Sequence, residues 1–144
     1  HVAALLRDSA EDDMNLLVSA VIAGNAVAAE RQYRLLAGSS AIPALRAIAR
    51  RLLQLAEARA AVDAGAQPQA AVKALRPPVF WKDVDAVAAA LRHWPLPRIR
   101  RALAAMLAGE QAIKQAGGPG DVAGWQAIVN LEAGANLGKR RERP

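Results

Sequence analysis

The sequence of 144 residues has no cysteine, two histidines and few aromatic residues: three Trp, one Tyr and one Phe. The lack of cysteine excludes a disulfide framework, a thiolate metal site and a thiol nucleophile, and it favours a cytoplasmic location. Metal-ligand spacing is absent, and His93 has no nearby carboxylate and nucleophile of the kind that a hydrolytic triad needs. We therefore expect no enzyme, no cofactor and no metal ion.

Long hydrophobic runs and strand-like alternation are also missing. No apolar run approaches the roughly 18 residues of a membrane span, so no contact with a membrane is expected. Alanine, leucine, arginine and glutamine dominate, and all four favour helix. The sequence therefore predicts an all-α fold, a compact bundle of about seven helices in one domain.

Caps and breakers set the expected helix boundaries. Asp12 or Asp13 would cap the first helix, Asn25 the second, Ser40 the third and Asp121 the last. The expected helices cover 13–23, 26–37, 41–64, 68–76, 81–93, a stretch from the turn at 94–97 to about 115, and a seventh after residue 121. Their apolar stripes predict an inward-facing set that includes Leu16, Leu17, Leu45, Ile48, Leu52, Leu55, Ile99, Met106, Leu107, Ile113 and Ile128.

The net charge of +6 is unevenly distributed, with an acidic start and arginine clusters further on. Arg46 and Arg50 are four residues apart on one predicted helix and repel each other unless a carboxylate or solvent compensates. Such clusters are either solvated faces or surfaces for an acidic partner or a nucleic-acid backbone. The segment 95–101 could open a recognition helix, but the alanines that follow favour nonspecific phosphate contact over base readout.

Residues 73–82 (KALRPPVFWK) form the most specific motif. Two prolines end any helix before Pro77 and restrict Arg76 to an extended conformation, and Phe80, Trp81 and Lys82 open the next helix. We expect this joint to act as a hinge between the long-helix half and the C-terminal helices. Phe80 and Trp81 could either hold the neighbouring helices together in the core or anchor an interface, and the core role is the favoured interpretation.

A second motif, residues 110–114 (EQAIK), places Glu110 and Lys114 in the favourable order at four-residue spacing. The order of 8–11 (DSAE), a glycine-stopped helical hairpin, a long arginine-bearing helix, 73–82 and 110–114 resembles the C-terminal domain of the delta subunit of bacterial DNA polymerase III, a clamp-loader component. The resemblance extends from about residue 8 to residue 131.

This resemblance implies a collar domain that packs with the C-terminal domains of the other loader subunits, gamma/tau and delta prime, in the bacterial replisome. Contact with the sliding clamp would belong to a separate N-terminal domain. Residues 1–11 would be a linker remnant from an upstream domain, 12–137 the helical collar domain, and 138–144 a disordered basic tail.

The interaction candidates combine these motifs with the arginine clusters. They are Arg46, Arg50, Arg76, Phe80, Trp81, Lys82, Arg98, Arg101, Glu110 and Lys114. Two alternatives stay open: a helical domain that contacts DNA nonspecifically, and a stand-alone helical scaffold or regulatory domain.

Overall fold

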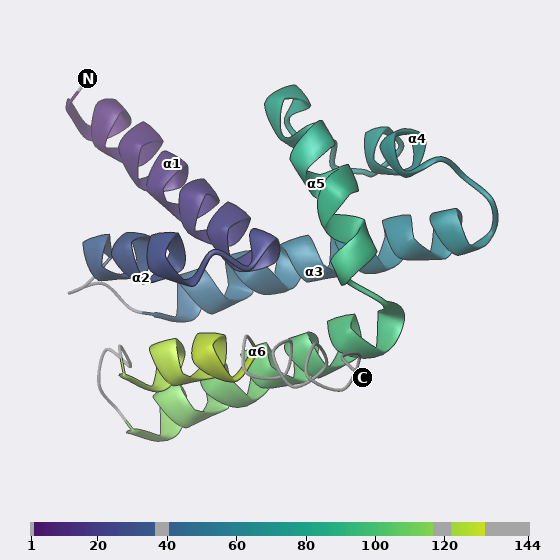
Figure 1. Cartoon of the computed structure of the whole chain (residues 1–144). Helices are drawn as coiled ribbons and strands as arrows, with labels where there is room; N and C mark the ends of the chain where they lie inside the picture. The colour runs from purple at the N-terminus through teal and green to yellow at the C-terminus, as the bar shows by residue number, and fades with distance from the viewer. Residues whose placement is uncertain (1, 37–40, 117–121, 132–144) are drawn as a thin grey trace.

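The computed structural model describes residues 2–36, 41–116 and 122–131, and within these ranges it is helical without strands (Figure 1). This confirms the all-α bundle. The labelled helices are α1 (Val2–Ala23), α2 (Ala26–Leu35), α3 (Ile42–Asp63), α4 (Pro68–Lys73), α5 (Val84–Ala90) and α6 (Leu96–Ala116). Two short 3-10 helices, η1 (Trp81–Asp83) and η2 (Leu91–His93), extend α5 at its two ends, and residues 122–131 form a seventh α-helix.

The first helix begins eleven residues earlier than the sequence suggested, at Val2 instead of Asp13. Asp12 and Asp13 therefore lie inside α1, where flanking alanine and leucine residues outweigh the capping tendency of aspartate. Residues 2–11, expected to be a linker remnant, form the first half of this helix. Their origin in an upstream domain stays a prediction.

Several predicted helix boundaries are confirmed. The side chain of Asn25 caps α2 by accepting a hydrogen bond from the Ala28 backbone N–H at 3.1 Å. Gly24 and Gly65 end α1 and α3 with φ of +76° and +112°, backbone angles that other residues rarely adopt. The caps predicted at Ser40 and Asp121, and the basic tail 138–144, lie outside the described residues.

The long helix α3 is the centre of the bundle, and α6 packs most extensively against it (Figure 1). The predicted stripe of α3 is buried, with Leu45, Ile48, Leu52 and Leu55 at most 1% exposed. On the other side, α1 crosses α3 and contacts α5. Leu16 and Leu107 were expected inside but are 53% and 59% exposed, because each lies one position away from the residue that faces the core, Leu17 or Met106.

Close approach of α6 to its neighbours depends on Gly109. A Cβ at this position would lie 2.7 Å from Ala127 Cβ and 3.0 Å from Leu45 Cδ1. The helix 122–131 is held further by ring contact between Tyr33 and Trp125, whose centroids are 5.2 Å apart. Its residue Ile128 is fully buried, as predicted.

Trp94, predicted only as part of a turn, is the largest fully buried side chain of the described residues. Its indole Nε1 donates a hydrogen bond of 2.9 Å to the backbone oxygen of Ile22, near the C-terminal end of α1. A carbonyl in the last turn of a helix has no partner within the helix, so this bond satisfies it. Trp94 thereby ties the turn before α6 to the end of α1.

Candidate protein-interaction surfaces

Arg46 and Arg50 lie on the same helix, α3, but have different surroundings. Arg46 turns to α6, where its Nε donates a hydrogen bond of 2.9 Å to Glu110 Oε1. Lys114 Nζ lies 3.4 Å from the same oxygen, which confirms the predicted pairing of Glu110 with Lys114. Arg46, Glu110 and Lys114 therefore form one intramolecular ion cluster between α3 and α6, and the Glu110 side chain is only 16% exposed.

This cluster has an electrostatic consequence for Glu110. Hydrogen bonding from Arg46 is the main cause that lowers the pKa of the Glu110 carboxyl below its usual range, partly opposed by desolvation; Lys114 lowers it further. The charges of this cluster are thus paired within the domain. Of the three residues, Arg46 and Lys114 keep solvent-exposed side chains.

The aromatic pair of the joint lies on the surface. Phe80 is 58% and Trp81 73% exposed, their ring centroids are 5.9 Å apart, and Lys82 Nζ lies 5.4 Å from the centroid of Trp81. The favoured core role is therefore wrong for both residues. Here the core is filled by the smaller apolar residues on either side of the prolines, Leu75 and Val79, which are 2% and 9% exposed.

The joint is tied to α3 and α4, and its expected role as a hinge stays a prediction. Gln54 Nε2 on α3 donates a hydrogen bond of 3.1 Å to the backbone oxygen of Pro77, while Leu75 and Val79 are buried on either side. Gln69 on α4 donates a further bond of 3.0 Å to Asp85 at the start of α5. The exposed aromatic rings consequently project from a segment that is bonded to α3 and packed into the core on either side of the prolines.

Arg98 and Arg101 have different surroundings. The guanidinium of Arg98 lies over the Trp94 ring, with Cζ 3.8 Å from its centroid, and donates to the backbone oxygen of His93. Arg98 therefore helps to cover the buried tryptophan. Arg101 is exposed beside a hollow of about 90 Å³ between α6 and the helix 122–131, where Asn130 and Leu131 contribute to the lining.

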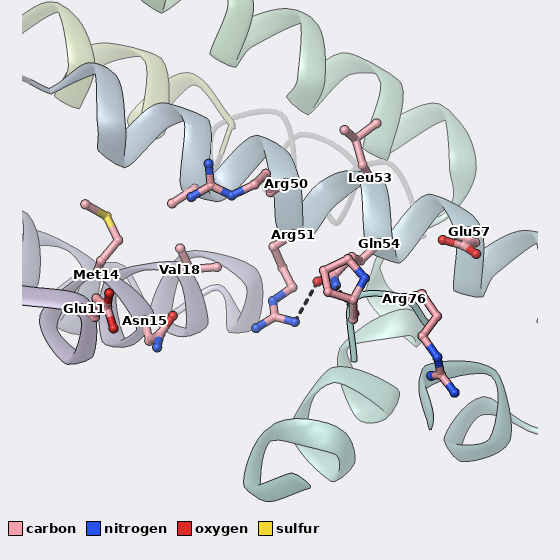
Figure 2. A pocket seen from close by; sticks show the side chains of 12 residues that line it. Glu11, Met14, Asn15, Val18, Arg50, Arg51, Leu53, Gln54, Glu57 and Arg76 are labelled. Carbon is pink, nitrogen blue, oxygen red and sulfur yellow. Dashed lines mark hydrogen bonds between the residues drawn. The ribbon is translucent and has the colours of Figure 1, made fainter. Parts of the chain in front are cut away.

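An open cleft of about 610 Å³ lies between α1, α3 and the joint, and Figure 2 shows its lining. Three arginines line it from two elements: Arg50 and Arg51 from α3, and Arg76 from the joint. The remaining lining residues are Glu11, Met14, Asn15, Val18, Ala47, Leu53, Gln54, Glu57 and Pro77. The volume is in the range of ligand-binding pockets.

Arg51 is held in position at the middle of this cleft. Its Nη1 donates a hydrogen bond of 2.9 Å to Gln54 Oε1, the same glutamine that binds the Pro77 carbonyl. Desolvation lowers the pKa of the Arg51 guanidinium, and the charge of Asp83 partly offsets this effect. Arg76 is held as well, because its Nη1 donates to the backbone oxygens of Leu75 and Lys73 at 2.8 and 3.3 Å.

Sequence reasoning named Arg50 and Arg76 as candidates but did not bring them together, and it missed Arg51 and Gln54 as site residues. The cleft has α1 as one wall, and the expected start at residue 13 left out the turn that carries Glu11. A signal was present in the doublet Arg50-Arg51, because adjacent helix residues point about 100° apart and only one could follow Arg46 toward α6.

In the part of the chain described by the structure, no helix is long and apolar enough to cross a bilayer. Across those same residues, no group of three or more His, Asp or Glu side chains is placed to hold a metal ion. Comparisons with protein-family models, curated proteins and solved structures found no match.

Proposed function

We propose that the chain is a non-catalytic assembly domain and that it serves as the C-terminal collar domain of the delta subunit of bacterial DNA polymerase III, in the bacterial cytoplasm. In this role it packs with the C-terminal domains of gamma/tau and delta prime into the collar of the clamp loader. The full subunit can then open the sliding clamp and load it on primed DNA.

One observation carries the proposal: Phe80 and Trp81 project from a backbone that α3 holds in place. Large aromatic side chains on a fixed support make good interface anchors, because little conformational entropy remains to be lost on binding. The same residues belong to the motif 73–82, on which the resemblance to the delta collar depends most. The surface and the sequence motif therefore favour the same kind of role.

Reconstitution with the other collar domains tests this function. The chain would be mixed with the collar domains of gamma/tau and delta prime together, so that it can be held at two interfaces, and complex formation followed by size-exclusion chromatography. We expect a three-component complex that Trp81→Ala and Phe80→Ala weaken. Leu107→Ala is the matched control, because Leu107 is an exposed apolar residue of α6 with a similar exposed fraction.

Two outcomes would contradict the proposal. A chain that elutes alone in the three-component mixture is not a collar domain of this loader. DNA binding that weakens steeply with salt, in the absence of any protein complex, would instead favour the nonspecific DNA-contacting alternative.

A further inference from the structure

We propose that the cleft between α1, α3 and the joint is a docking site for an acidic amphipathic polypeptide segment of a partner protein, whose carboxylates pair with Arg50 and Arg51. The inference concerns a different surface from the exposed aromatic pair and does not depend on the identity of the parent complex.

The arginines of the cleft have donor capacity to spare. Within the described residues, Arg50, Arg51 and Arg76 form no salt bridge, although other arginines of the same domain, Arg46 and Arg59, do. Each guanidinium has five N–H donors, and the hydrogen bonds of Arg51 and Arg76 to neutral oxygens use only some of them. A carboxylate that enters the cleft would therefore meet unused donors on Arg50 and donors on Arg51 that Gln54 holds in place.

Burial makes such a pairing stronger at Arg51 than at an exposed arginine. This side chain is half-buried and partly desolvated, so part of the cost of removing water from it is already met in the folded domain. A planar guanidinium can also bind a carboxylate through two parallel hydrogen bonds, which fixes its orientation. Arg51 is thus the central anchor, with Arg50 beside it.

The other lining residues select a polypeptide over a phosphate backbone. Figure 2 shows Glu11 toward one end of the cleft and Glu57 toward the other, with Arg50 and Arg51 between them. These two carboxylates would repel the evenly spaced charges of a nucleic acid, whereas a peptide can place its acidic residues at the middle alone. Met14 and the exposed Leu53 add apolar surface, and this suits the apolar face of an amphipathic segment.

The probes for this site are three fluorescein-labelled amphipathic peptides of about 14 residues, which is about four helical turns. They share one leucine face and differ only at two central positions one turn apart, which hold glutamate, glutamine or lysine. Fluorescence anisotropy would measure their binding to the full chain. Because a charged hydrogen bond is worth more than a neutral one, we expect the glutamate peptide to bind at least about tenfold more tightly than the glutamine peptide, and the lysine peptide to bind least.

Variants of the chain place the binding in the cleft. Arg50→Gln, at an exposed position, should weaken binding of the glutamate peptide about tenfold without changing the fold. Arg51→Lys should also weaken this binding, although it keeps the positive charge. Arg100→Gln is the matched control, since it removes one exposed arginine of α6 outside the cleft.

Three results would overturn the inference: no binding of the glutamate peptide at saturating concentration, equal binding of the glutamate and glutamine peptides, or equal effects of Arg50→Gln and Arg100→Gln. A labelled oligonucleotide supplies the other class of ligand. If it binds, loses affinity with Arg50→Gln and is not displaced by the glutamate peptide, the cleft is a phosphate site and the polypeptide assignment is wrong.

Discussion

Replacing Trp81 by alanine should have little effect on the stability of the isolated domain, although tryptophan is its largest kind of side chain. Because Trp81 is 73% exposed, only about a quarter of its surface is removed from water by folding. A tryptophan exposes about 250 Å² when unfolded, so about 60 Å² is at stake. At about 25 cal/mol per Å², and with the compactness of real denatured states considered, the loss is about 1 kcal/mol.

Trp94→Ala is the matched comparison, since it removes the same side chain from a fully buried position. Truncation of a buried Trp costs about 3–5 kcal/mol through lost transfer free energy and the remaining cavity. It would also leave the Ile22 carbonyl without its indole donor and Arg98 without its ring partner. In a domain of this size each kcal/mol lowers Tm by about 3–5 °C, which separates the two variants clearly.

Thermal unfolding followed by circular dichroism measures both effects. We expect Trp81→Ala to lower Tm by about 3–5 °C and Trp94→Ala by about 10 °C or more, or to prevent folding. An equal loss for both variants would refute the reasoning, because it would mean that the ring of Trp81 carries core packing that its exposure excludes. In the three-component mixture, Trp81→Ala should keep its fold and still weaken assembly.

Further predictions concern the ion cluster, a close helix contact and a cap. Glu110→Gln should lower Tm near neutral pH. Since folding lowers the pKa of Glu110, the contribution of its carboxylate to stability is present above the ordinary pKa of about 4.3 and is lost as pH falls below that value. The Tm values of variant and parent should therefore converge in acid, and a constant difference would contradict this. Gly109→Ala gains about 1 kcal/mol of helix propensity but collides with Ala127, for a net loss of about 1 kcal/mol in chemical denaturation; a more stable variant would show that α6 can shift. Asn25→Ala should cost about 1 kcal/mol by the same assay and Asn25→Asp much less, a distinction that disappears if the cap is unimportant.

The helices could be predicted from sequence because their signals are local. Asn25, Gly24 and Gly65 act on the backbone next to them, and the stripe of α3 repeats at helical spacing. The predicted start of α1 was wrong because the prediction used a local signal. Asp13 is a good cap residue, but a longer run of helix formers overrides it.

The burial of the aromatic residues could not be predicted this way. Trp81 opens a helical segment and Trp94 follows one, and periodicity gives little direction to a residue at the end of a helix. The burial of Trp94 depends on the end of α1, which lies 72 residues earlier in the sequence at the bonded Ile22 carbonyl. To predict this contact one must know how α1, α5 and α6 pack, and local patterns in a single sequence do not reveal that packing.

The arginines of α3 show how the fold selects which charges remain for a partner. Arg46 is drawn to Glu110 on α6, Arg51 is held by Gln54 beside the joint, and Arg59 binds Asp63 together with the Leu91 carbonyl, which closes η2 against α3. Arg50 has no such bond to any residue that the structure describes, and it lies in the cleft. The charge repulsion that the sequence placed between Arg46 and Arg50 is therefore resolved for one of them inside the domain. For Arg50 it remains to be resolved by solvent or by a ligand, and a substitution there tests binding with the least disturbance of folding.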